Sequence, residues 1–187
     1  MILRFYILVM FLCCCVNSYA EKSGVFANLN VSYAAIDLNY SSKQFEPFER
    51  WNNKQESVAF GVGIGYQFNS RVVIDFNYAS LDTINFYNAV DSYRLIHKDV
   101  SLGYKFGWKN LYLMPQIGYA DWRLSAKEGK FLNPGSEETK IIFDSDYVWG
   151  FSIGFDKPNL ALFLSHKIVD TNFGGYDLSS IGFNIFL

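Results

Sequence analysis

Two histidines, and the serine beside one of them, are the residues best suited to acid–base or nucleophilic chemistry. His97 and His166 are the two histidines of the sequence, and Ser165 directly precedes His166. Neighbouring residues of a β-strand point to opposite faces, so Ser165 and His166 cannot readily act as nucleophile and base. Neither histidine has a carboxylate cluster nearby in the sequence, which argues against a metal site. These residues therefore predict neither an enzyme nor a metalloprotein.

A glycine-rich segment, Gly61-Val62-Gly63-Ile64-Gly65, is the candidate for cofactor binding. The dinucleotide fingerprint requires its third glycine one position later, where Tyr66 stands, and a helix after it. Alternation of small and apolar residues continues through the segment, which is typical of a strand with small side chains on one face. We therefore predict no cofactor.

Apolar and polar residues alternate with a period of two in eight segments of the chain. An amphipathic helix would space its apolar residues by three and four, and a membrane-spanning helix would need about 18 continuous apolar residues. Neither pattern occurs after residue 20. The sequence thus predicts eight β-strands, at 25–34, 57–68, 72–79, 96–106, 111–120, 146–155, 160–167 and 180–187.

Short and long connections alternate between these strands. The short ones are 69–70, 107–110 and 156–159, and the long ones are 37–56, 80–93, 121–145 and 168–177. With an even number of strands, this alternation puts every long loop at one end and both termini at the other. Pro115 lies inside the fifth strand, where it removes one ladder hydrogen bond, so we expect a bulge there.

Three features indicate that the apolar faces point outwards, into lipid. The opposite faces carry mainly Gly, Ser, Ala and Asn, which suit the crowded interior of a narrow barrel. Each apolar face is about nine to eleven residues long, the length of a tilted membrane strand. Aromatic residues gather at both ends of the apolar faces, as in interfacial girdles. The alternative is a soluble barrel with an apolar core. The girdle residues are Tyr33, Tyr78, Tyr119, Tyr147 and Trp149 at the long-loop end, and Tyr66, Phe68, Tyr104, Phe106 and Phe155 at the other.

Five charged residues lie on the inward faces in this arrangement. Charges at membrane depth should face the interior and pair with one another. They could line an ion path or form a structural network that fills the interior. Eight strands leave an interior just wide enough for side chains, which favours the structural network. The five residues are Asp75, Asp99, Lys105, Asp146 and Lys167.

The N-terminus has the features of a secretory signal peptide. Arg4 precedes an apolar stretch at 5–16, and residues 17–20 supply a small-x-small cleavage site. We therefore predict a signal peptide at 1–20 and one domain at 21–187, the alternative being a retained anchor. All three cysteines (Cys13, Cys14 and Cys15) lie in the signal, so the mature chain can form no disulfide.

The net charge of −2 indicates no nucleic-acid partner.

Taken together, these features resemble the small OmpA/OmpX/Ail-type barrels of the bacterial outer membrane, over nearly the whole mature chain. The resemblance implies an all-β, eight-stranded antiparallel up-and-down transmembrane β-barrel, surrounded by outer-membrane lipid and lipopolysaccharide. It also implies a C-terminal strand that the barrel-assembly machinery reads, here through Phe183, Ile185 and Leu187. The family usually ends in Phe, whereas this chain ends in Leu187, with Phe186 in the opposite phase.

The predicted function is a structural or adhesive role at the cell surface, with a host or cell-surface ligand bound through loops 37–56 and 121–145. Loops on a rigid scaffold commonly carry binding, and these two mix aromatic with charged residues. The first alternative is a narrow pore for small solutes. The second is a lipid A-modifying enzyme, although the deacylase pattern of Ser two residues after His is absent, because Ile168 stands there.

Overall fold

The computed structural model describes residues 23–38, 54–82, 92–127, 139–171 and 174–187. They form a single antiparallel sheet, and no described helix is long and apolar enough to cross a membrane. The predicted signal peptide at 1–20 lies outside the described residues. The strands are β1 (Gly24–Leu38), β2 (Lys54–Gln67), β3 (Val72–Asp82), β4 (Ser92–Tyr104), β5 (Phe106–Trp108), β6 (Leu111–Lys127), β7 (Thr139–Lys157), β8 (Leu160–Thr171) and β9 (Gly174–Phe186).

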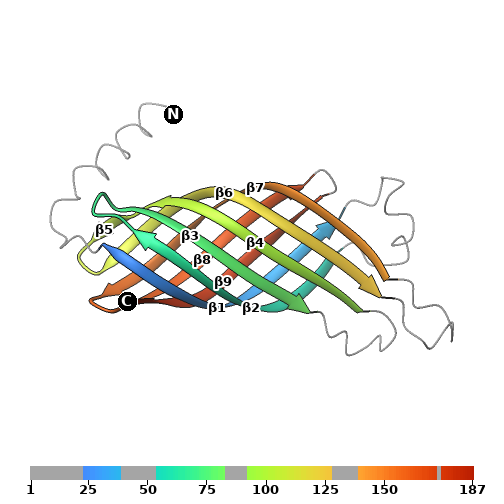
Figure 1. The fold of residues 1–187 in the computed structure, drawn as a ribbon, viewed down its shortest axis with the longest axis horizontal. Coiled ribbons are helices and arrows are strands. Elements are labelled where there is room, and N and C mark those ends of the chain that lie inside the picture. Colours follow the sequence, from blue (N-terminus) through green and yellow to red (C-terminus); the bar gives the residue numbers. More distant parts are fainter. Residues whose placement is uncertain (1–22, 39–53, 83–91, 128–138, 172–173) are drawn as a thin grey trace.

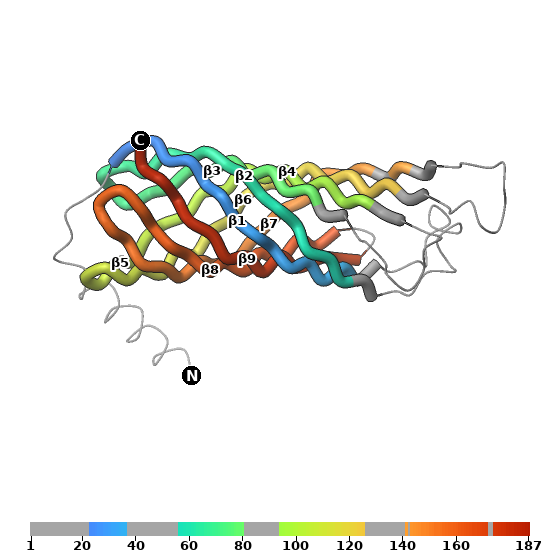
Figure 2. Tube along the Cα trace, turned by 90° about the horizontal axis from the view of Figure 1, so that it is seen from below, coloured from blue at the N-terminus to red at the C-terminus, as the bar shows by residue number. Residues whose placement is uncertain are grey.

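The sheet closes on itself into an up-and-down barrel (Figures 1 and 2). Apart from β4 and β5, each strand pairs with the next along the chain, and β1 pairs with β9 to close the ring. Both β4 and β5 pair with β6 and follow one another along it, so they are two parts of one strand. The predicted eight-stranded antiparallel barrel is confirmed.

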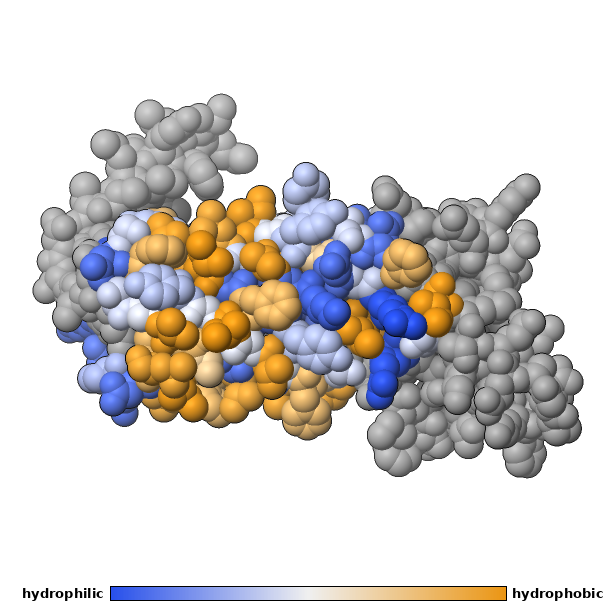
Figure 3. Space-filling model, in the orientation of Figure 1, coloured by the Kyte–Doolittle hydropathy of each residue, from blue (hydrophilic) through white to orange (hydrophobic). Residues whose placement is uncertain are grey.

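Alternation along the strands separates an apolar outer face from a small, polar or aromatic inner one. Leu102 and its register partner Ile117 are 50% and 60% exposed, whereas the neighbouring Ser101 is 1% exposed. Hydrophobic residues form a band over the left-hand and central part of the barrel in Figure 3. So large an exposed apolar surface requires lipid as its solvent. The predicted orientation, apolar side out, is therefore confirmed.

Aromatic pairs mark both borders of this apolar band. At the long-loop end, the rings of Tyr119 and Tyr147 meet edge to face, with centroids 5.8 Å apart. At the end with the short turns, Tyr66 packs on Phe68 in the same manner at 4.8 Å. Amphipathic rings of this kind sit at the membrane–water interface. The two borders indicate which part of each strand lies in the membrane.

The four long loops are shorter than the sequence predicted, because the strands continue past the girdle. The connection predicted at 121–145 starts with β6, which runs to Lys127, and ends with β7, which begins at Thr139. The other three predicted boundaries move in the same direction: β1 ends at Leu38 and β2 starts at Lys54, β3 ends at Asp82 and β4 starts at Ser92, and β8 ends at Thr171 and β9 starts at Gly174. Buried side chains beyond the girdle, such as Trp122 and Leu124, supply a core that keeps these strands paired.

The bulge predicted at Pro115 is wrong. Gln116 pairs with Gly103, and Leu113 pairs with Phe106, so the register on the two sides of Pro115 is continuous and no residue is inserted. The ladder is only interrupted there, which divides β4 from β5. Proline lacks the N–H that the ladder needs, and the nearby backbone N–H of Lys105 donates instead to the Arg71 carbonyl, at 3.0 Å.

A charge on the lipid face should destabilise the barrel according to its depth. Leu102→Arg places a guanidinium near the middle of the apolar band and should lower the free energy of unfolding by about 2–4 kcal/mol. Ile96→Arg, on the same strand and face but beyond the girdle, should cost less than about 1 kcal/mol. Urea unfolding in lipid vesicles measures both. Equal losses for the two variants would contradict the assigned membrane position.

Candidate functional site

The interior of the barrel is divided into three layers, which can be read along single strands. On β1 the inward residues are Phe26, then Asn28, Asn30 and Ser32, then Ala34 and Ile36. A central polar layer thus lies between two apolar clusters. The turn-end plug consists of Phe26, Val73, Tyr112, Met114, Ala161 and Phe163. The loop-end plug consists of Ala34, Ile36, Ala59, Ala79, Leu95, Ala120, Trp122, Leu124, Val148, Val169, Tyr176 and Leu178.

Asp99 is the best-connected side chain of the central polar layer. Lys167 Nζ donates to Asp99 Oδ2 at 2.6 Å and to Ser101 Oγ at 3.2 Å. The Ser101 hydroxyl also donates to Asp99 Oδ2, and His97 Nε2 lies 2.9 Å from Asp99 Oδ1. On its other side, His97 Nδ1 is 2.7 Å from the Tyr176 hydroxyl. The buried carboxylate is therefore matched by a cation and further hydrogen bonds, as a charge away from water requires.

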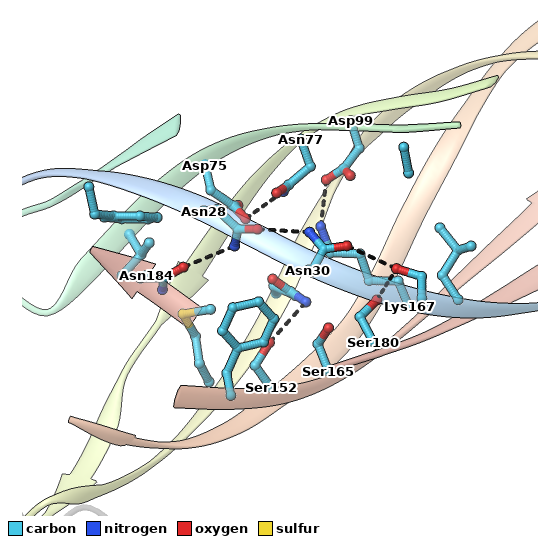
Figure 4. Close-up of a pocket in the computed structure, with 18 of the residues that line it drawn as sticks. Asn28, Asn30, Asp75, Asn77, Asp99, Ser152, Ser165, Lys167, Ser180 and Asn184 are labelled. Carbon is cyan, nitrogen blue, oxygen red and sulfur yellow. Dashed lines mark hydrogen bonds and ion pairs between the residues drawn. The ribbon is translucent and has the colours of Figure 1, made fainter. Parts of the chain in front are cut away.

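Asparagines continue the polar layer towards the turn end (Figure 4). Asn77 Nδ2 donates to Asp75 Oδ2 at 2.7 Å. Along β1, Asn30 donates to Asn28 at 2.7 Å, and Asn28 donates to its register partner Asn184 on β9 at 2.9 Å. The result is a chain of side-chain hydrogen bonds that joins β1 to β9 from the inside. Such a network rigidifies the wall when its members are satisfied.

A second ion pair lies at the turn end, beside the turn-end plug. Lys105 Nζ is 3.0 Å from Asp156 Oδ2 and 4.2 Å from the centroid of the Tyr112 ring. Both charged groups are buried. The pair connects Lys105, which lies between β4 and β5, to Asp156 near the end of β7. It therefore stabilises the part of the wall where the ladder is interrupted beside Pro115.

The structure places four of the five predicted interior charges in the buried interior, namely Asp75, Asp99, Lys105 and Lys167. Asp146 is half-buried towards the loop end, where it accepts a hydrogen bond of 2.9 Å from Trp122 Nε1. Lys105 pairs with Asp156. The sequence pattern places Asp156 in the short connection 156–159, so Asp156 is not among the five predicted interior charges. Alternation could have found it, because Asp156 follows the outward Phe155 and so continues the inward phase.

Little space remains between these side chains. A cavity of about 50 Å³ lies in the central polar layer. Most of the residues that line it are polar, among them Asn28, Asp75, Asp99 and Lys167. By volume it has room for about three to five water molecules. No group of three or more His, Cys, Asp or Glu residues in the described chain is arranged to hold a metal ion.

The two residues Ser165 and His166 point to opposite faces, as expected for neighbours on β8. Ser165 lines the interior cavity, while His166 Nδ1 lies 3.0 Å from the hydroxyl of Ser179 on β9. Sequence reasoning did not foresee this cross-strand Ser–His contact, because it depends on the register of two strands. A catalytic Ser–His pair also needs a group that orients the histidine. No carboxylate within the described segments is hydrogen-bonded to His166.

A polar groove lies on the outer surface at the level of the loop-end girdle and beyond it. Lys98 is the register partner of both Tyr78 and Asp121, and Arg123 lies two residues further along β6. Lys98 and Arg123 are exposed, and Phe143 projects beside them with 78% of its surface exposed. The groove is lined by Tyr78, Ile96, Lys98, Asp121, Trp122, Arg123, Phe143, Asp144 and Ser145. Cations next to aromatics are suited to anionic groups at the membrane surface.

Comparison with known proteins identifies the family. The outer membrane protein beta-barrel domain matches residues 6–186. The chain belongs to this family. The match places the protein in the bacterial outer membrane. In barrels of this membrane the short turns are periplasmic and the long connections are extracellular. The turn-end plug is therefore periplasmic and the loop-end plug extracellular.

Solved structures share the fold at low sequence identity. Ail, the attachment invasion locus protein of Yersinia pestis, is 10% identical, with a TM-score of 0.63 over 89% of this chain and 100% of Ail. Neisserial surface protein A is 14% identical, with the same TM-score and coverage. OprG from Pseudomonas aeruginosa is 9% identical, with a TM-score of 0.59 over 89% of this chain and 97% of OprG. No curated protein matches the sequence significantly.

Removing the cation that faces Asp99 should destabilise the barrel. Lys167→Met leaves a buried carboxylate without its ion pair, and the free energy of unfolding should fall by about 3–5 kcal/mol. Lys167→Met combined with Asp99→Asn removes both charges and should recover most of this loss. Urea unfolding in lipid vesicles, followed by tryptophan fluorescence, measures each variant. Lys98→Met, at an exposed position, is the control. A loss for Lys167→Met no larger than that of the control would refute the pairing.

Proposed function

We propose that this protein is a surface-exposed outer-membrane barrel that binds a host or cell-surface ligand through its extracellular connections, and that it does not conduct solutes. The barrel serves as a rigid base in this proposal. The polar network formed by Asp99, Lys167 and their partners has a structural role, as do the charges of Asp75, Lys105 and Asp146. The ligand itself is specified by loop chemistry that no motif records.

The observation that carries the proposal is the extracellular plug. Trp122, Leu95 and Tyr176 are each at most 3% exposed, and they meet inside the barrel between the polar layer and the extracellular end. A hydrated ion would have to pass this apolar layer and then the periplasmic plug. The desolvation that this demands opposes conduction. A barrel whose interior is filled with packed side chains is rigid, and a rigid base suits loops that bind a ligand.

The length of the strands supports a binding role. A tilted strand needs about 9–11 residues to cross a membrane, whereas β7 has 19 and β6 has 17. The surplus lies beyond the extracellular girdle, since β6 continues past Tyr119 to Lys127 and β7 begins at Thr139, before it reaches Tyr147. Paired strands hold the loop ends in place, which reduces the entropy lost on binding.

Two of the similar structures add weight to a surface role. Ail is the attachment invasion locus protein, and one Ail structure contains the heparin analogue sucrose octasulfate. The Neisserial protein is named a surface protein. At 10–14% identity these names support a role in attachment for the present chain without specifying its ligand.

Two membrane partners belong to the same proposal. Lipopolysaccharide carries phosphates close to the extracellular girdle, where Lys98 and Arg123 face outwards, so this groove is suited to lipopolysaccharide rather than to the ligand. The barrel-assembly machinery would recognise the last strand, β9, through Phe183, Ile185 and Leu187. Ile185 and Leu187 are exposed on the outer surface, where another protein can reach them.

Electrical recording separates the proposed role from the alternative of a narrow pore. The purified barrel in a planar lipid bilayer should leave the conductance at baseline. A variant with Trp122→Ala and Leu95→Ala thins the extracellular plug and should be the more conductive of the two. Discrete conductance steps from the unmodified protein would favour the pore.

Analysis of lipid A by mass spectrometry tests the enzymatic alternative, for which His166 and Ser179 would be the residues to replace.

Loop replacement tests the binding role directly. The predicted ligand regions are 37–56 and 121–145, and their central parts, 39–53 and 128–138, lie outside the described residues. Replacing 45–51, or separately 128–138, with Gly/Ser linkers leaves every described strand intact. At least one replacement should reduce binding of intact cells to host cells or matrix proteins by tenfold or more.

The control for this experiment is the fold of each variant. A closed barrel resists SDS until it is boiled, so unheated and boiled samples should differ in gel mobility. Val148→Ala, inside the extracellular plug and outside both ligand regions, alters the barrel interior and should leave binding unchanged. If the parent binds and both folded loop variants bind equally well, the proposal is wrong.

A further inference from the structure

A furrow crosses the lipid-facing surface of β6 to β9 near the periplasmic end. Its floor is a row of register partners, Tyr112, Gly154, Phe163 and Gly182, one from each strand. The two aromatic side chains of this row are buried inside the barrel, packed against the glycines. A Cβ on Gly154 would lie 2.6 Å from ring carbons of Tyr112, and one on Gly182 would lie 2.7 Å from Phe163 Cζ. The row therefore presents only backbone to the lipid.

Two rows of apolar side chains form the walls of the furrow. The neighbouring rows on either side of the floor point outwards, because side chains alternate along every strand. At the end formed by β5, Phe106 and Trp108 add to the walls. A backbone floor between side-chain walls makes a concave apolar surface. The periplasmic wall consists of Leu111, Phe155 and Leu162, and the other wall of Leu113, Ile153, Leu164 and Ile181.

Two lysines stand at the periplasmic side of the furrow. Lys109 lies in the turn between β5 and β6, with Nζ 5.3 Å from the centroid of the Trp108 ring. Lys157 lies at the end of β7, with Nζ 5.9 Å from the centroid of Phe155. Trp108 and Phe155 both line the furrow. Each ammonium group is thus held above an aromatic wall residue.

The two turns that carry these lysines are joined to each other. The backbone N–H of Asp156 donates to the carbonyl of Asn110 at 2.7 Å. Asn110 follows Lys109, and Asp156 precedes Lys157, so the bond brings the two cationic positions to adjacent turns. Figure 2 shows both turns at the same end of the barrel. The position corresponds to the headgroup layer of the periplasmic leaflet, just beyond the end of the apolar surface.

We propose that this furrow is a binding site for one anionic phospholipid of the periplasmic leaflet. An acyl chain lies between the two apolar walls, and the phosphate and acidic headgroup face Lys109 and Lys157. Apolar contact alone would accept any acyl chain. The two neighbouring lysines add a preference for a negatively charged headgroup, because each cation near a membrane surface attracts anionic lipid. Lys109 and Lys157 therefore determine which lipid binds.

Native mass spectrometry of the folded, delipidated barrel in a neutral detergent tests this proposal. Dioleoyl phosphatidylglycerol and dioleoyl phosphatidylcholine are added separately at equal concentrations. One phosphatidylglycerol should bind about tenfold more tightly than phosphatidylcholine. Lys109→Gln with Lys157→Gln should bring the two affinities to within about twofold. Lys109 lies in an exposed turn and Lys157 is exposed at the last position of β7, so the barrel should fold, and the heat shift on a gel verifies it.

Two further variants separate the furrow from a general effect of apolar surface. Ile153→Ala with Leu162→Ala lowers both walls and should weaken the binding of both lipids at least threefold. Val100→Ala with Leu102→Ala, on the lipid face of β4, should leave both affinities unchanged.

Equal affinity of the unmodified barrel for the two lipids would overturn the proposal. So would a preference for phosphatidylglycerol that survives the removal of both lysines. If lowering the walls has no effect while removing the lysines does, the lipid is held by charge alone and the furrow is not the site.

Discussion

The structure depends on one constraint: backbone N–H and C=O groups inside a membrane have no water to bond with. A sheet meets this constraint only if it has no free edge, because every unpaired group in lipid costs several kcal/mol. The pairing of β1 with β9 removes the last edge. Closure then determines the rest, since a closed sheet of alternating side chains has one face for lipid and one for an enclosed interior.

The enclosed interior is too narrow to remain an aqueous channel, and side chains fill it in layers. Apolar residues close both ends, and the polar residues between them satisfy one another. Asp99 with Lys167, and Lys105 with Asp156, are each matched inside the barrel. The same filling makes the barrel a rigid support and argues against transport. This filling is the reason for proposing that binding takes place at the extracellular connections and on the lipid-facing wall.

The wall itself is not a uniform cylinder. Where Pro115 interrupts the ladder, a buried ion pair and the Tyr112 ring hold the interior side together. Nearby, the packing of aromatics over glycines inside leaves a hollow outside. The outer surface differs between the two leaflets of the membrane. It carries a polar groove at the extracellular girdle and an apolar furrow with lysines at the periplasmic end. This matches the different lipids on the two sides of an outer membrane.

Alternation along the chain is enough to predict the strands, their inner and outer faces and the interior location of Asp75, Asp99, Lys105 and Lys167, because a period of two is local information. The contact between Lys105 and Asp156, and the contact between His166 and Ser179, become visible only in the folded barrel. The register of neighbouring strands sets these contacts, and no local pattern encodes it. The extension of strands past the girdle was missed for a related reason. In the sequence, those residues have the polar composition of connections. In the closed barrel, Trp122, Leu95 and Tyr176 come together from three different strands and form one core.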